Sequence, residues 1–131
     1  MVMKCFTSYY SGIRVLPEGV VPISIAGWPP EGWTGPQFKA LAPKRAFFLE
    51  WKKNHDNGFY AKHFQEEVLR PLNPREVWSG LLVLSGGAPF ALCCYERSGG
   101  FCHRHLVSEW LRSAGYDIAE FISQEDPPAL F

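Results

Sequence analysis

The chain of 131 residues is long enough for one domain with its own core, and an aromatic content of 15% excludes an intrinsically disordered protein. Thirteen basic and thirteen acidic residues leave no net charge at pH 7, so the composition does not indicate a nucleic-acid-binding or membrane-surface protein. Because no apolar run approaches the ~18 residues of a membrane span, and the first residues do not resemble a signal peptide, we expect one soluble domain over residues 1–131 with no membrane partner.

The cysteines indicate the cellular compartment. Four cysteines are too few for a disulfide-stabilised scaffold, and two of them, Cys93 and Cys94, are neighbours in the sequence. Such a pair suits a reducing environment. We therefore predict a cytoplasmic protein with free cysteines.

The first third of the chain predicts two strands and a long loop. A first strand should end near residues 7–9, before the break at Ser11-Gly12. The stretch "GVVPISIAG" predicts a second, buried strand. Residues 28–43 are rich in Pro, Gly and Trp and predict a loop, and long loops in compact domains usually either have a function or are disordered.

Three helices are predicted to follow. The first begins near Pro43 and carries "KRAFFLEWKKN", because proline is favoured in the first turn of a helix. The second has an apolar residue at every fourth position, namely Tyr60, Phe64, Val68 and Leu72. The third has Asn73 as its N-cap and Pro74 as its first residue, and it ends at Gly86-Gly87.

The last third predicts a strand, a helix and a strand. "APFALCC" has the composition of a fully buried strand, "CHRHLVSEWLRSAG" of a helix ended by Gly115, and "YDIAEF" of a last strand before a frayed tail over residues 123–131. About four strands with helices between the last three predict an α/β fold: a three-layer single domain with a small, mostly parallel sheet and crossover helices. Ligands in such folds bind beyond the carboxyl ends of the strands.

The stretch "CCYERSGGFCHRH", residues 93–105, lies at one of these strand ends. The unpaired N–H groups at the start of a helix attract anions, and Arg97 or Arg104 could bind the same group through two hydrogen bonds. The first hypothesis is therefore a pocket for a phosphate-bearing or otherwise anionic small molecule, such as a nucleotide or a nucleotide derivative. The other candidate ligand-binding residues lie at the strand ends, in the long loop or in this turn: Ser8, Tyr9, Tyr10, Arg14, Trp28, Lys39, Cys94 and His103.

Two other interpretations stay open. The first is an enzyme that acts on a nucleotide or a glycosidic bond, with Cys102 as a thiolate nucleophile activated by the helix start, or with Glu96 as nucleophile or general base. The second is a non-catalytic interaction module of a phage or of a host-defence locus. In that case Cys102 is a small residue beside the core, and Glu96 is the structural partner of an arginine.

A zinc site is a further alternative for the same turn. Cys94, Cys102, His103 and Glu96 all carry side chains that bind zinc, but the chain has no C-x-x-C pair. We therefore predict no metal site and assign no cofactor. On a helical wheel His103 lies on the apolar face of its helix, whereas His105 points away from that face.

Three blocks of the sequence resemble the bacterial and phage family called domain of unknown function 488 (DUF488). They are "ISIAGWPPEGWTGPQFKALAP", "FYAKHFQEEVL" and above all "FALCCYERSGGFCHRHLVSEWLRSAGYDIAEF". The last block contains Cys94-Tyr95-Glu96 at a strand end and Cys102-His103-Arg104 at a helix start. The resemblance implies a small cytoplasmic α/β protein with this turn as its signature, and it implies no particular reaction.

Overall fold

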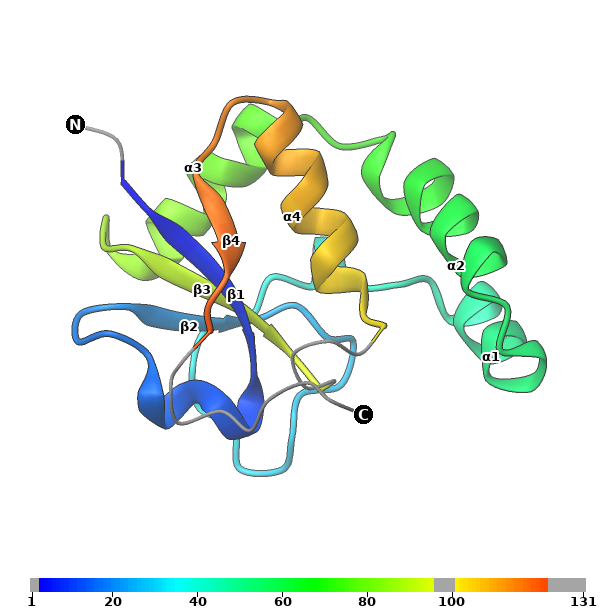
Figure 1. Ribbon diagram of the computed structural model, residues 1–131, viewed down its shortest axis with the longest axis horizontal. Helices are drawn as coiled ribbons and strands as arrows, with labels where there is room; N and C mark the ends of the chain where they lie inside the picture. The colour runs from blue at the N-terminus through cyan, green and yellow to red at the C-terminus, as the bar shows by residue number, and fades with distance from the viewer. Residues whose placement is uncertain (1–2, 96–100, 123–131) are drawn as a thin grey trace.

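The computed structural model describes residues 3–95 and 101–122, which form an α/β fold around a four-stranded parallel sheet (Figure 1). The strands lie in the order β2-β3-β1-β4. Their bounds are Cys5–Tyr9 for β1, Val21–Ser24 for β2, Phe90–Cys94 for β3 and Ile118–Glu120 for β4. Tyr9 is in register with Cys94, and Ser24 with Cys93, so the carboxyl ends of β1, β2 and β3 lie at one edge of the sheet.

The predicted helices are present between the last three strands. They are α1 over Arg45–Asn54, α2 over Asn57–Phe64, α3 over Pro74–Ser85 and α4 over His103–Ser113. A π-helical segment, η3, continues α2 over Gln65–Leu69, and two 3-10 segments lie earlier in the chain, η1 over Tyr10–Val15 and η2 over Lys39–Leu41. Apart from η2 and a single bridge between Ser24 and Gln37, residues 28–43 form the predicted loop. The predicted frayed tail lies outside the described residues.

The helices bury one face of the sheet. Helices α3 and α4 lie together along one side of the sheet, and η1 lies on the other side (Figure 1). Because side chains alternate along a strand, Ile23, Leu92 and Ile118 share one face, where they belong to the same core cluster as Leu81 of α3 and Leu111 of α4. Among the described residues, no helix has both the length and the apolar character needed to cross a bilayer.

The third helix starts where its capping residue predicts. The Asn73 side-chain oxygen accepts hydrogen bonds from the backbone N–H groups of Arg75 and Glu76, at 2.9 and 3.3 Å, and Pro74 is the first helical residue. At the other end Gly86 adopts a φ of 68°, a left-handed conformation that suits glycine. The local signals alone therefore fix both ends of α3.

Replacing Asn73 with alanine should lower the free energy of unfolding by about 1 kcal/mol, because two backbone N–H groups lose their acceptor. Urea denaturation followed by circular dichroism measures the change. Asn73→Asp keeps a capping oxygen and should cost only a few tenths of a kcal/mol. Equal losses in the two variants would show that the cap is not the cause.

Candidate functional site

A cavity of about 750 Å³ lies at the carboxyl edge of the sheet. Its wall combines residues 26–28 after β2, Lys39 of η2, one side of α1, the end of β3 and the start of α4. The cavity therefore lies at the edge of the sheet where the strand-end rule predicts a ligand site.

Much of the cavity wall is aromatic. Within it the Phe101 ring centroid lies 5.1 Å from that of Tyr60 and 5.7 Å from that of Trp51, and these last two rings are 5.4 Å apart. Trp28 also lines the cavity and is 78% exposed, so its ring is available to a ligand. The Tyr95 hydroxyl donates a hydrogen bond to the Trp28 carbonyl, which ties the loop after β2 to the end of β3.

The charged side chains of the cavity are all cationic. Lys39, Arg45 and Lys52 line it, and no carboxylate does so among the described residues. Arg45 and Lys52 are seven residues apart on α1 and therefore share a face of that helix, and the Lys52 ammonium lies 5.5 Å from the centre of the Phe48 ring. The wall thus provides positive potential in a chain with no net charge.

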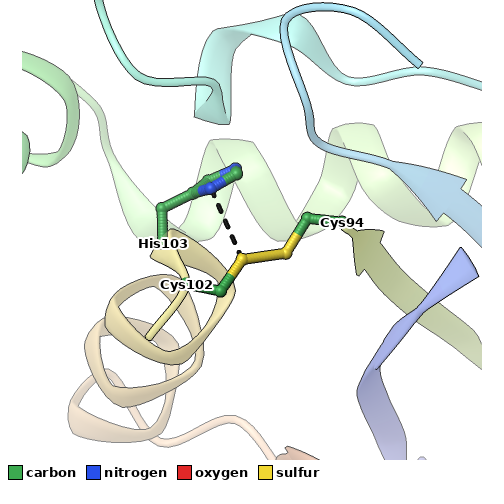
Figure 2. Close-up of side chains that lie close together, drawn as sticks. All are labelled: Cys94, Cys102 and His103. Atoms are coloured by element: carbon green, nitrogen blue, oxygen red, sulfur yellow. Dashed lines mark hydrogen bonds between the residues drawn. A yellow bond between two sulfur atoms is a disulfide. The ribbon is translucent and has the colours of Figure 1, made fainter. Parts of the chain in front are cut away.

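Two cysteines and a histidine that line the cavity lie close together (Figure 2). Cys94 ends β3, Cys102 is the residue before α4, and the two sulfurs form a disulfide. The prediction of free cysteines is therefore wrong for this pair, because the end of β3 and the start of α4 bring the sulfurs together. Cys5 and Cys93 are free and buried, and burial raises the pKa of Cys93 to about 12.

His103 is held as a neutral imidazole with one nitrogen facing the cysteines. Its Nε2 donates a hydrogen bond to the Ile25 carbonyl at 2.8 Å, so Nδ1 carries the lone pair and lies 3.7 Å from the Cys102 Sγ. Burial lowers the pKa of His103 to about 4. The inward orientation predicted from the helical wheel is confirmed, since His103 is buried and its ring packs against Phe64, whereas His105 is half-buried rather than exposed.

Arg104, predicted to bind the anion, is directed away from the cavity. Its side chain is completely buried and makes two hydrogen bonds to the Glu120 carboxylate, from Nε at 3.0 Å and from Nη2 at 2.8 Å. Its Nη1 donates to the Cys94 Sγ at 3.2 Å, and Thr7 donates a further hydrogen bond to Glu120. The guanidinium therefore joins β4 to the end of β3 and positions the Cys94 sulfur.

The residues predicted after the first strand do not reach the cavity wall. Ser8 and Tyr9 are buried in the sheet. Tyr10 hydrogen-bonds with the Ser24 hydroxyl and packs edge-on against Tyr95, and Arg14 belongs to η1. None of these side chains lines the cavity.

Five of the predicted site residues do come together at the cavity: Trp28, Lys39, Cys94, Cys102 and His103. Glu96 and Arg97 lie outside the described residues. Arg45 and Lys52 were not among the predicted residues, although their seven-residue spacing, with Phe48 and Leu49 between them, is itself the pattern of a single helix face.

A comparison with models of protein families identifies the family of the chain. The family model of DUF488-N3a, described as the active DUF488-N3 subclade, matches residues 7–115, which include every residue that lines the cavity. No curated protein and no solved structure matches the chain. The match to the family model spans most of the sequence, and the chain therefore belongs to the DUF488 family.

Proposed function

We propose that the cavity binds a small anionic molecule with a flat organic part, such as a nucleotide. The observation that supports this function is the charge of the wall: three cationic side chains and no described carboxylate line a cavity that is otherwise largely aromatic. Cations bind phosphate or carboxylate groups, and aromatic rings stack on a base. A volume of about 750 Å³ lies within the usual range for small-molecule sites.

The cations that would hold the anion differ from those first expected. Arg104 is engaged by Glu120 and Cys94, so Lys39, Arg45 and Lys52 take over this role. Lys52 is exposed, and its attraction for an anion should weaken as the salt concentration rises. The exposed ring of Trp28 would cover the base.

Replacing Lys52 with glutamine should weaken the binding of a nucleoside monophosphate about tenfold, because one charge-assisted hydrogen bond is lost. Isothermal titration calorimetry at low salt measures the dissociation constant. Lys53→Gln is the matched control, because Lys53 is the next residue of α1, is exposed and does not line the cavity. The proposal fails if the unmodified protein binds no nucleotide, or if both variants weaken binding equally.

A thiol enzyme is a second candidate, supported by the hydrogen bond from Arg104 to Cys94. In the reduced protein the guanidinium would favour the thiolate of Cys94, whereas the sequence favours Cys102 as the nucleophile. Both sulfurs belong to residues of the cavity wall. The catalytic roles of Cys102 and Glu96 and the alternative of an interaction module stay predictions.

We also infer a cytoplasmic location from the low cysteine content, and there the disulfide would meet cellular reductants.

A further inference from the structure

We propose that the reduced protein binds one Zn²⁺ ion through the Cys94 Sγ, the Cys102 Sγ and the His103 Nδ1, with a fourth coordination position open toward the cavity. This metal site goes beyond the anionic-ligand site and does not rest on it. Two thiolates and one imidazole with an open fourth position form a known type of catalytic zinc site.

The three ligand atoms are already close enough for one ion. All of them lie within 4.8 Å of one another, and the Cys102 Sγ to His103 Nδ1 distance is 3.7 Å. Ligand atoms of tetrahedral zinc, at bond lengths near 2.3 Å for sulfur and 2.0 Å for nitrogen, lie about 3.5 to 3.8 Å apart. The Cα atoms of Cys94 and Cys102 are 7.4 Å apart, wider than the roughly 4.4 to 6.8 Å that is usual for a disulfide. The backbone therefore leaves room for an ion between the two sulfurs once the bond is reduced.

The imidazole is prepared for metal binding by its other nitrogen. His103 Nε2 donates to the Ile25 carbonyl, an arrangement that fixes the tautomer and the ring orientation in most histidine–metal sites. Phe64 packs against the same ring from the core side. The Nδ1 lone pair consequently faces the cysteine sulfurs without any rearrangement of the side chain (Figure 2).

The charge of the metal would be balanced by the ligands themselves, because the charged side chains that line the cavity are cationic. Two thiolates would neutralise the charge of Zn²⁺, and the hydrogen bond from Arg104 to the Cys94 sulfur would stabilise one of them. Glu120 balances the guanidinium through its two hydrogen bonds. All three ligand residues are more than nine-tenths buried, so little competing water surrounds the ligand atoms.

Formation of the site requires reduction of the disulfide. With a trialkylphosphine, the S–S bond breaks, phosphorus is oxidised to the phosphine oxide with oxygen from water, and the two water protons complete the two thiols. Zinc binding then displaces both thiol protons to solvent, whereas His103 contributes a lone pair and loses no proton. The oxidised protein has no thiolates at this site and should bind no zinc there.

The fourth position would connect the metal to the cavity. Cys94, Cys102 and His103 all line the cavity, so the side of the ion away from its three ligands would face that space. A water molecule there would become more acidic, as on other zinc ions with three protein ligands. An oxygen of an anionic ligand could occupy the same position, close to the cations of the wall.

The test uses the full chain, reduced without oxygen by a phosphine, freed of the reductant and mixed with zinc chloride alone. After removal of unbound metal, elemental analysis should find one zinc per chain in the reduced protein and at least tenfold less in the oxidised protein. Cobalt chloride should give the charge-transfer band of cobalt–thiolate bonds together with the visible bands of a tetrahedral site. No zinc in the reduced chain, or cobalt spectra without the thiolate band, would refute the site.

Variants separate this site from adventitious binding. Cys94→Ser and Cys102→Ser should each weaken zinc binding on the order of 100-fold, and so should His103→Gln, whose amide can still donate to the Ile25 carbonyl. Cys93→Ser is the matched control and should bind zinc normally, because Cys93 lies on the opposite face of β3. Zinc retained in Cys94→Ser at the unmodified level would overturn the assignment. If the serine variants do not fold, the comparison of reduced with oxidised protein still decides.

Discussion

Replacing Arg104 with methionine should lower the free energy of unfolding by about 3–5 kcal/mol, one of the largest losses available from a single side chain of this protein. The substitution removes both guanidinium hydrogen bonds to Glu120, whose carboxylate is only 17% exposed, and the hydrogen bond to the Cys94 sulfur. Guanidinium chloride denaturation of the oxidised protein at neutral pH measures the change.

A second substitution shows whether the lost partner is the cause. Adding Glu120→Gln to the Arg104→Met chain removes the carboxylate charge, and the amide can still accept the Thr7 hydrogen bond. The double variant should therefore recover part of the lost stability, as expected for two residues of one network. A loss below about 1 kcal/mol in the single variant is what the removal of an exposed ion pair would cause. Such a small loss would contradict the assignment of Arg104 and Glu120 as a buried ion pair.

Replacing Phe64 with alanine should cost about 3–5 kcal/mol through the cavity it leaves in the core. Phe64 is 0% exposed, and its ring centroid lies 6.0 Å from that of Tyr60 and 5.6 Å from that of His103. Thermal unfolding and urea denaturation measure the loss. Phe59→Ala is the matched control on α2, since Phe59 is half-buried and its removal should cost clearly less. Equal costs would mean that Phe64 is not a core residue of the native state.

Much of the fold is predictable because its signals are local. The cap at Asn73, the proline after it and the left-handed Gly86 define α3 without reference to any other element. The buried composition of "FALCC" likewise predicts β3, since a strand covered on both faces needs no polar alternation. The order of the strands cannot be predicted from local signals, because it depends on which segments pair across long separations in the chain.

The part of the candidate site that is formed by two consecutive elements, β3 and α4, is predictable. Cys94, Cys102 and His103 converge because a strand end and the following helix start are close in any crossover unit. The burial of Arg104 could not be predicted, since its partner Glu120 lies sixteen residues later on an edge strand. Arg45 and Lys52 are hard to recognise for another reason: they share their helix face with Phe48 and Leu49, and this apolar spacing predicts a helix that faces the core rather than a cationic cavity wall.

The π-helical segment η3 has a consequence for the cavity. In a regular α-helix each step of four residues overshoots a full turn by about 40°, so a row of residues spaced by four winds slowly around the axis. The wider turn at Gln65–Leu69, closed by the Arg70 N–H bonding to the Gln65 carbonyl, takes up part of this drift. Residues spaced by four consequently stay on one side of this segment: Tyr60, Phe64 and Val68 are all buried in the core, and Tyr60 also reaches the cavity wall.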